Sequence, residues 1–258
     1  MGDVRQRLRN VRDSVLAFGV PQRGPRLVAD AARVWSDDSS DSWAEDSHWR
    51  GGGRIDDDRF AAIGAEHLAL FDRLAGTVGG RQHLGRVLEW GAGGGANAVA
   101  FAPRADEFVA VDVAAASLPE CARQVRAVCD TPVVEILVDL AAPESALGTI
   151  PRPVDVAVCL YVLELVPTPA YGLRVLGVLA DALAPDGLAF VQIKYDTGRL
   201  RTRSRRRNYR RNSANMTTYR LDEFWTAAGT VGLEPLAMTL VPENDLDERY
   251  AYLLLRRR

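Results

Sequence analysis

The sequence predicts an α/β domain of the doubly wound type, with a mostly parallel sheet. From Arg86 onward, short apolar runs alternate with segments of helix length, which is typical of parallel strands covered on both faces by helices. A glycine-rich turn directly follows the first apolar run and leads into a helix. Two later runs end at the acidic residues Asp112 and Asp139. Ligands of open α/β sheets bind at such strand ends, so these observations also predict where a ligand site lies.

The N-terminal part does not show this alternation of strands and helices. We therefore divide the chain into an extension, 1–83, and a ligand-binding domain, 84–258. Residues 1–34 are predicted to form one or two helices, and the apolar spacing of 59–76 predicts another. The segment between them, 35–58, is acidic and rich in serine and glycine, yet contains three tryptophans. Disordered segments are poor in aromatic residues, so we expect this loop to fold against the domain as a lid or substrate cap.

Within the ligand-binding domain, the elements follow one another at regular intervals. The predicted strands are 86–90, 107–113, 132–140, 154–165 and 188–196, followed by a closing pair at 234–242 and 248–258. The segment 91–102 is predicted to be the glycine-rich turn and the start of a helix, and the further predicted helices are 117–128, 171–187 and 221–232. Ser117 and Glu120 are spaced as a capping box at the start of one helix, and Pro185 with Gly187 is expected to end another. An arginine-dense insertion, 198–220, interrupts the pattern.

Composition excludes several classes of protein. The chain is 47% hydrophobic and 26% charged, and its net charge of -2 favours neither a nucleic acid nor a membrane as partner. Its three cysteines show no spacing typical of disulfide frameworks or zinc sites. We recognise no signal peptide and no apolar run long enough to span a bilayer. These features predict a cytoplasmic protein.

The glycine-rich turn carries the clearest chemical signal. Gly91, Gly93 and Gly95 allow a tight turn and a close approach of a ligand to the backbone. Glu89 stands two residues before the first glycine, where a carboxylate can hold an ammonium group. Asp112 stands twenty-one residues after Gly91, where a carboxylate can accept hydrogen bonds from ribose hydroxyls. Gly91 and Gly93 also fit the dinucleotide pattern G-x-G-x-x-A, so an NAD-dependent oxidoreductase is an alternative.

These residues, together with Val138-Asp139-Leu140 and the segment from Cys159 to Glu164, resemble motifs I to IV of class I S-adenosylmethionine-dependent methyltransferases. The resemblance covers about residues 84–255 and implies the strand order 3-2-1-4-5-7-6, with strand seven antiparallel. It implies that the glycine loop and Glu89 contact the methionine part of the cofactor, and that Asp112 binds the ribose. The residues implied or expected to bind S-adenosylmethionine are Glu89, Gly91, Ala92, Gly93, Gly95, Asn97, Asp112, Val113, Asp139, Leu140, Leu160 and Tyr161.

The resemblance does not identify a general base. Many members that act on small molecules read L-E-H after strand four, but this sequence reads Leu163-Glu164-Leu165. We therefore consider His48, in the tryptophan-rich loop, and Glu164 as candidate catalytic residues, since a hydroxyl acceptor must lose its proton. His67 is expected to lie on a helix face among core residues, and His83 in a turn. No metal site is predicted, because the acidic cluster of residues 37–46 lacks the spacing of a calcium loop.

The acceptor is less well determined by the sequence. Tyr195 and Asp196, at the end of strand five, are candidates to line its pocket, and the arginine-dense insertion that follows is suited to an anionic group. We expect O-methylation of a small-molecule or glycan acceptor, with an anionic acceptor as one option. N-methyl transfer and a non-catalytic module that contacts RNA are the remaining alternatives. The sequence does not indicate an oligomeric state.

Overall fold

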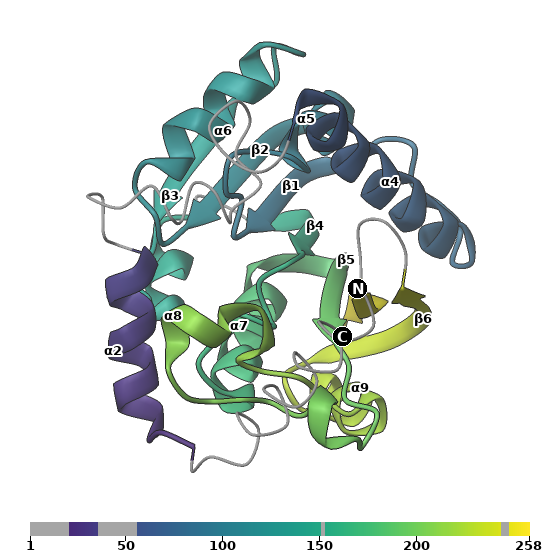
Figure 1. Ribbon diagram of the computed structural model, residues 1–258. Coiled ribbons are helices and arrows are strands. Elements are labelled where there is room, and N and C mark those ends of the chain that lie inside the picture. The colour runs from purple at the N-terminus through teal and green to yellow at the C-terminus, as the bar shows by residue number, and fades with distance from the viewer. Residues whose placement is uncertain (1–20, 36–55, 151–152, 244–247) are drawn as a thin grey trace, which may run out of the picture.

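A seven-stranded sheet in the order β3-β2-β1-β4-β5-β7-β6 forms the centre of the molecule (Figure 1). The structure is a computed structural model that describes residues 21–35, 56–150, 153–243 and 248–258. The strands from β3 to β5 are parallel, whereas β7 is antiparallel to both β5 and β6. The expected strand order and the antiparallel strand are both confirmed.

The bounds of the elements follow the predicted alternation. The strands are β1 (Gly85–Trp90), β2 (Ala105–Asp112), β3 (Val133–Leu137), β4 (Val154–Cys159), β5 (Leu183–Lys194), β6 (Leu233–Glu243) and β7 (Glu248–Arg257). The α-helices are α2 (Gly24–Trp35), α4 (Asp57–Gly76), α5 (Ala98–Phe101), α6 (Ser117–Arg126), α7 (Pro169–Ala182), α8 (Tyr209–Asn212) and α9 (Leu221–Thr230). Short 3-10 helices are η1 (Ala102–Arg104), η2 (Pro143–Gly148), η3 (Leu200–Thr202) and η4 (Ser213–Asn215).

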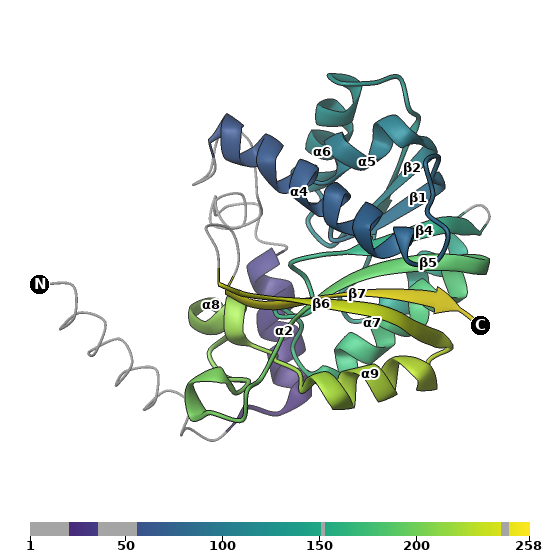
Figure 2. The same ribbon diagram turned by 90° about the vertical axis from the view of Figure 1, so that its right-hand side faces the viewer.

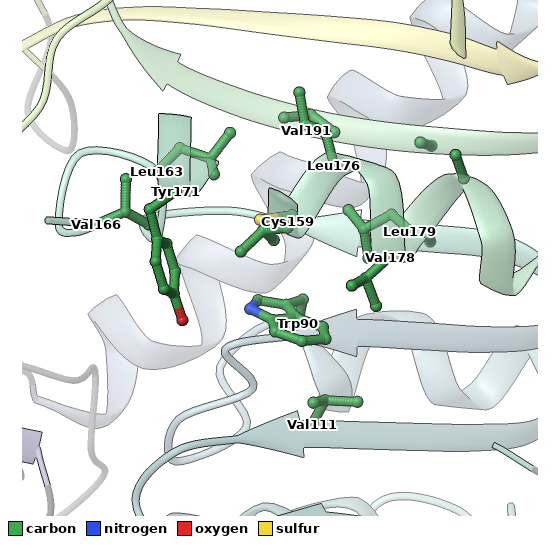
Figure 3. Close-up of a cluster of buried hydrophobic side chains, with 14 of the residues drawn as sticks. Trp90, Val111, Cys159, Leu163, Val166, Tyr171, Leu176, Val178, Leu179 and Val191 are labelled. Atoms are coloured by element: carbon green, nitrogen blue, oxygen red, sulfur yellow. The ribbon is translucent and has the colours of Figure 1, made fainter. Parts of the chain in front are cut away.

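Helices cover both faces of the sheet, as Figure 2 shows. On one face, α4, α5 and α6 pack against side chains such as Val87 and Phe108. On the other, α2, α7 and α9 contribute to a second cluster, which contains Leu88 and Val109 of the sheet, and α9 packs beside β6 and α7. Figure 3 shows part of this second cluster, in which Trp90 at the end of β1 lies near residues from β4 and α7. The parallel strands are buried on both faces, which explains why they read as apolar runs in the sequence.

Three local predictions are wrong. Helix α7 ends at Ala182, not at Gly187, because Leu183 already pairs with Val154 as the start of β5. Strand β4 ends at Cys159, not at 165. The capping box does not form, because Ser117 lies inside α6, whose N-cap is Ala116.

The arginine-dense insertion forms a folded layer in the structure. It contains η3, α8 and η4, and the side chains of Tyr209 and Met216 within it are buried. Helix α2 of the N-terminal extension lies beside α8 (Figure 1). Of the predicted tryptophan-rich loop, 35–58, residues 36–55 lie outside the described residues, so its role as a lid stays a prediction. At its two ends, Trp35 closes α2 and Asp57 begins α4. Among the helices that the structure describes, none is long and apolar enough to span a membrane.

Candidate functional site

A cleft of about 950 Å³, counting its open mouth, lies at the carboxyl ends of β1, β2 and β4. Most of the residues predicted to bind the cofactor line it, namely Gly91, Ala92, Gly93, Asn97, Asp112, Val113, Leu140, Leu160 and Tyr161. The remaining predicted residues, Glu89, Gly95 and Asp139, are not part of its lining. The topology thus brings together strand ends that are far apart in sequence, which is where open α/β sheets bind ligands.

The glycine loop requires glycine at its first position. The backbone of Gly91 has φ +77, and a Cβ added there would lie 2.3 Å from Cγ2 of Val162. Gly93 and Gly95 also have positive φ, at 51° and 91°. Glycine adopts this conformation without the steric penalty of other residues. The loop therefore presents bare backbone to the cleft.

Asp112 is fixed in place by the backbone around it. Its Oδ2 accepts a hydrogen bond from the amide of Gly93 at 2.8 Å, and its Oδ1 accepts one from the amide of Ala114 at 2.8 Å. Burial raises the pKa of this carboxyl, and the hydrogen bonds from these amides counteract the rise. A carboxylate oxygen can accept more than one hydrogen bond, so Asp112 retains the capacity to bind ligand hydroxyls.

Glu89 lies beneath the loop and is only 1% exposed. Its Oε1 accepts a hydrogen bond from Nδ2 of Asn97 at 2.8 Å, while Oε2 has no partner among the described residues. Burial raises the pKa of Glu89 to about 8, although the hydrogen bond from Asn97 lowers it and the charge of Asp112 raises it further. A buried polar atom without a partner costs about 1–3 kcal/mol, so a cationic donor at Oε2 would remove a penalty.

A buried network of polar side chains continues from Asn97 and was not predicted from the sequence. Nδ1 of His67 lies 2.7 Å from Oδ1 of Asn97, and its Nε2 lies 2.9 Å from the hydroxyl of Tyr252. The predicted place of His67 on a helix face among core residues is confirmed, because it is 2% exposed on α4. Tyr252 comes from β7 at the other end of the chain, so no local pattern could have identified this contact.

Tyr161 occupies the turn after β4. Its φ is 55°, a left-handed conformation that is uncommon for residues other than glycine. Its amide donates a hydrogen bond to Oε1 of Gln192 at 2.5 Å. Its ring packs edge-on against Tyr250, with 5.5 Å between ring centroids. This turn forms one wall of the cleft.

The candidate bases are not equally placed. Glu164 is 2% exposed, accepts a hydrogen bond from the hydroxyl of Tyr250 at 2.9 Å, and is not part of the cleft lining. His48 lies outside the described residues. His83 is exposed and pairs with Asp106 at 3.1 Å, as expected for a turn residue.

The two residues at the end of strand five that were expected to line the acceptor pocket, Tyr195 and Asp196, are held by other contacts. Oδ1 of Asp196 accepts hydrogen bonds from the hydroxyl of Thr202 at 2.6 Å and from the amide of Gly198 at 2.8 Å, which fixes the start of the insertion. Neither Tyr195 nor Asp196 lines the cleft.

Asp139, which the resemblance implied as a cofactor residue after β3, is exposed. Its side chain accepts a hydrogen bond from the amide of Ala141 at 2.8 Å.

Aromatic side chains close one end of the cleft. Nε1 of Trp35 donates to the hydroxyl of Tyr209 at 2.7 Å, and that hydroxyl donates to the carbonyl of Leu165 at 2.7 Å. Tyr171, drawn in Figure 3, donates to the carbonyl of Leu140 at 2.7 Å, and burial raises its pKa to about 12. These rings are therefore held as rigid walls.

The described part of the cleft lining contains no arginine. Arginines of the insertion instead border a second depression, which includes Arg203, Arg206 and Arg220 together with Asp196. No group of histidine, cysteine and acidic residues suited to hold a metal ion occurs in the described ranges.

This sheet and its glycine-lined cleft are those of a class I S-adenosylmethionine-dependent methyltransferase with a Rossmann-like fold, and a family model described as a methyltransferase domain matches residues 56–237. The chain belongs to that family. No protein among those with curated descriptions matches it in sequence. The assignment as a methyltransferase, made from the motifs, is confirmed over the dehydrogenase alternative.

Solved structures of methyltransferases share the fold. The N-methyltransferase NodS of Bradyrhizobium japonicum WM9, in complex with S-adenosylhomocysteine, has 17% sequence identity and a TM-score of 0.54, covering 75% of this chain and 86% of its own. The magnesium protoporphyrin IX methyltransferase of Synechocystis PCC 6803 has 13% identity and a TM-score of 0.60, covering 88% and 98%. The 1,6-didemethyltoxoflavin-N1-methyltransferase of Burkholderia thailandensis has 18% identity and a TM-score of 0.60, covering 93% and 92%.

Proposed function

We propose that this methyltransferase transfers the methyl group of S-adenosylmethionine to a hydroxyl group of a small-molecule or glycan acceptor. The observation that carries the proposal is the aromatic end of the cleft, where Trp35, Tyr171 and Tyr209 stand beside the predicted cofactor residues. Aromatic walls with few polar groups are typical of sites for small organic ligands. An acceptor with a flat, apolar part fits this lining best.

The residues in and around the cleft fit the cofactor. Oε2 of Glu89, which has no partner among the described residues, suits the ammonium of the methionine part, and Asp112 suits the ribose hydroxyls. Val113 is suited to pack on the adenine, and Asp139 with the Leu140 backbone to bind its amino group. The cofactor supplies a methyl group on a sulfonium sulfur, which is electrophilic.

The protein supplies position and, for a hydroxyl acceptor, removal of a proton. Rigid aromatic walls hold the acceptor against the Tyr161 turn, so that its nucleophile lies in line with the reacting methyl. His48 and Glu164 remain the candidate bases. N-methyl transfer has a specific observation in its favour, because two of the similar structures described above are N-methyltransferases by name.

The test is a screen of hydroxyl- and amine-bearing small molecules and oligosaccharides with methyl-labelled cofactor, read out as formation of S-adenosylhomocysteine. The carbon-13 chemical shift of the transferred methyl distinguishes an O-methyl from an N-methyl product. We expect turnover with aromatic alcohols, weakened by Trp35→Ala through the acceptor KM. Turnover only with amines would contradict the O-methylation proposal, and turnover only with proteins or RNA would contradict the small-molecule or glycan proposal.

The insertion provides a second, separable proposal about charge. If an anionic part of the acceptor reaches the depression at Arg203, Arg206 and Arg220, replacing these arginines by serine raises the acceptor KM and leaves affinity for S-adenosylhomocysteine unchanged. Unchanged acceptor KM in the triple variant would show that the acceptor is not held through these charges.

A further inference from the structure

Six residues, four from separate helices and strands and two from the turns that precede α5 and follow β4, form a continuous chain of hydrogen bonds below the cleft. Glu89 is on β1, Asn97 precedes α5, His67 is on α4, Gln192 is on β5 and Tyr252 is on β7, and each of these is at most 5% exposed. The sixth is Tyr161, in the turn after β4. Figure 2 shows α4, which carries His67, lying across the face of the sheet that α5 and α6 also cover. A buried polar network that is well satisfied holds its members in one arrangement.

The directions of the hydrogen bonds follow from the atoms at the two sides of the chain that can only donate or only accept. The amide of Tyr161 can only donate, so Oε1 of Gln192 faces it and Nε2 of Gln192 points toward Tyr252, at 2.9 Å from the hydroxyl. The Tyr252 hydroxyl accepts that bond. Because Oδ1 of Asn97 can only accept, Nδ1 of His67 is the donor to it, and Nε2 of a neutral imidazole then accepts from the hydroxyl of Tyr252. A neutral imidazole with Nε2 as acceptor carries its proton on Nδ1.

The same logic continues to the cofactor side. Nδ1 of His67 donates to Oδ1 of Asn97, which turns the Nδ2 of Asn97 toward Oε1 of Glu89. The amide of Asn97 is thereby prevented from rotating, and Oε1 of Glu89 is engaged. Only Oε2 of Glu89 is left without a partner among the described residues. The chain of hydrogen bonds thus ends on Oε1 of the carboxyl group whose other oxygen, Oε2, is proposed to meet the cofactor.

We propose that His67 is a positioning residue, which holds Asn97 and, through it, the carboxyl group of Glu89 in place for the ammonium of the cofactor. His67 itself does not line the cleft, so its effect passes through Asn97. The inference rests on the proposed role of Glu89. It assigns a function to a histidine whose sequence context predicts only a core position.

The experiment compares two ligands that differ at the group concerned. S-adenosylhomocysteine has the ammonium and carboxylate, whereas 5′-methylthioadenosine retains the adenosyl sulfur and lacks both. We expect His67→Phe in the full chain to weaken S-adenosylhomocysteine about tenfold, the effect of losing a hydrogen bond that supports a charged group. Affinity for 5′-methylthioadenosine should stay within about twofold, because a change confined to the ammonium contact cannot reach it.

Controls separate positioning from packing. Phe71→Leu alters a buried residue one turn further along α4 without touching the chain, and it should change the ratio of the two affinities by less than about twofold. His67→Asn, which keeps an amide nitrogen near the place of Nδ1, should recover most of the lost affinity. Tyr252→Phe removes only a hydroxyl and serves if His67→Phe does not fold, with a smaller loss in the same direction.

Each outcome decides the matter. A loss for S-adenosylhomocysteine alone supports the positioning role. Equal losses for both ligands, or no loss for either, overturn it while leaving the cofactor site intact. Failure of the unmodified protein to bind S-adenosylhomocysteine, with 5′-methylthioadenosine still bound, would instead overturn the role of Glu89 and the inference together.

Discussion

Trp35 and Tyr209 are 174 residues apart in sequence and are joined by a hydrogen bond of 2.7 Å from the indole to the hydroxyl. This bond ties α2 of the N-terminal extension to α8 of the arginine-dense insertion. Both side chains line the cleft. Two segments outside the parallel part of the sheet thus meet to build the wall on which the proposed acceptor site depends.

Tyr209→Phe tests this wall. The change leaves the ring but removes the partner of Trp35 and of the Leu165 carbonyl, so we expect a loss of about 1–3 kcal/mol in the free energy of unfolding. We also expect a higher acceptor KM with little change in affinity for S-adenosylhomocysteine. Denaturant unfolding measures the free energy of unfolding, initial rates measure the acceptor KM, and tryptophan fluorescence titration measures the affinity for S-adenosylhomocysteine.

The matched control is Tyr195→Phe, since the structure gives the Tyr195 hydroxyl no hydrogen bond to any residue it describes. That variant should unfold within about 0.5 kcal/mol of the unmodified protein. If both variants behaved alike, the hydrogen bonds of Tyr209 would not be holding the wall together.

Gly91→Ala tests the loop. The residue would have to keep φ +77 with its Cβ 2.3 Å from Val162, and a left-handed conformation costs about 1–3 kcal/mol for a residue other than glycine. We expect at least tenfold weaker binding of S-adenosylhomocysteine, measured by calorimetry. The double variant with Val162→Ala removes the clash but not the strain, so it should recover only part of the affinity.

Gly177→Ala is the corresponding control for this prediction. Gly177 lies within α7, and a Cβ there would meet nothing within 4 Å. Alanine should stabilise the helix by about 0.5–1 kcal/mol and leave cofactor affinity unchanged. Equal cofactor affinity in the Gly91 and Gly177 variants would mean that the loop tolerates a side chain where the geometry forbids one.

The sequence predicted those features that depend on neighbours along the chain. The strand ends at Trp90 and Asp112 were found because apolar runs end in glycine or an acid, and the cleft forms from those ends. The pairing of His67 with Tyr252 was not found, because 185 residues separate them and neither stands in a motif. The end of α7 also depends on a distant residue. The helix stops at Ala182, earlier than predicted, because Leu183 pairs with Val154 in the sheet.

Glu164→Gln tests one candidate base. If Glu164 accepts the acceptor's proton, kcat should fall by at least about a hundredfold, as for the loss of a general base, while affinity for S-adenosylhomocysteine is retained. His48→Ala provides the same test for the other candidate. A Glu164 variant that loses stability but retains kcat would instead identify the residue as structural, through its hydrogen bond from Tyr250.

The pH dependence of cofactor binding follows from Glu89. Its pKa of about 8 means that the carboxyl of the ligand-free protein carries a proton below that pH. A cation at Oε2 favours the ionised form, so binding of S-adenosylhomocysteine should release a proton between about pH 5 and 8, and affinity should rise with pH by at most about tenfold per unit. At more alkaline pH the ligand's own ammonium group loses its proton, so affinity should fall again there.

Calorimetry in buffers of different ionisation enthalpy measures the released proton directly. Glu89→Gln has no carboxyl to ionise, so it should release none, and its deficit in affinity should be larger at pH 8 than at pH 6. Proton release at pH 6 is specific to a raised pKa of Glu89. A carboxyl with the ordinary pKa of 4.5 would already be ionised at that pH and would release no proton on binding. If the unmodified protein had equal affinity at pH 6 and pH 8 and released no proton, then binding of the ammonium would not be coupled to ionisation of Glu89.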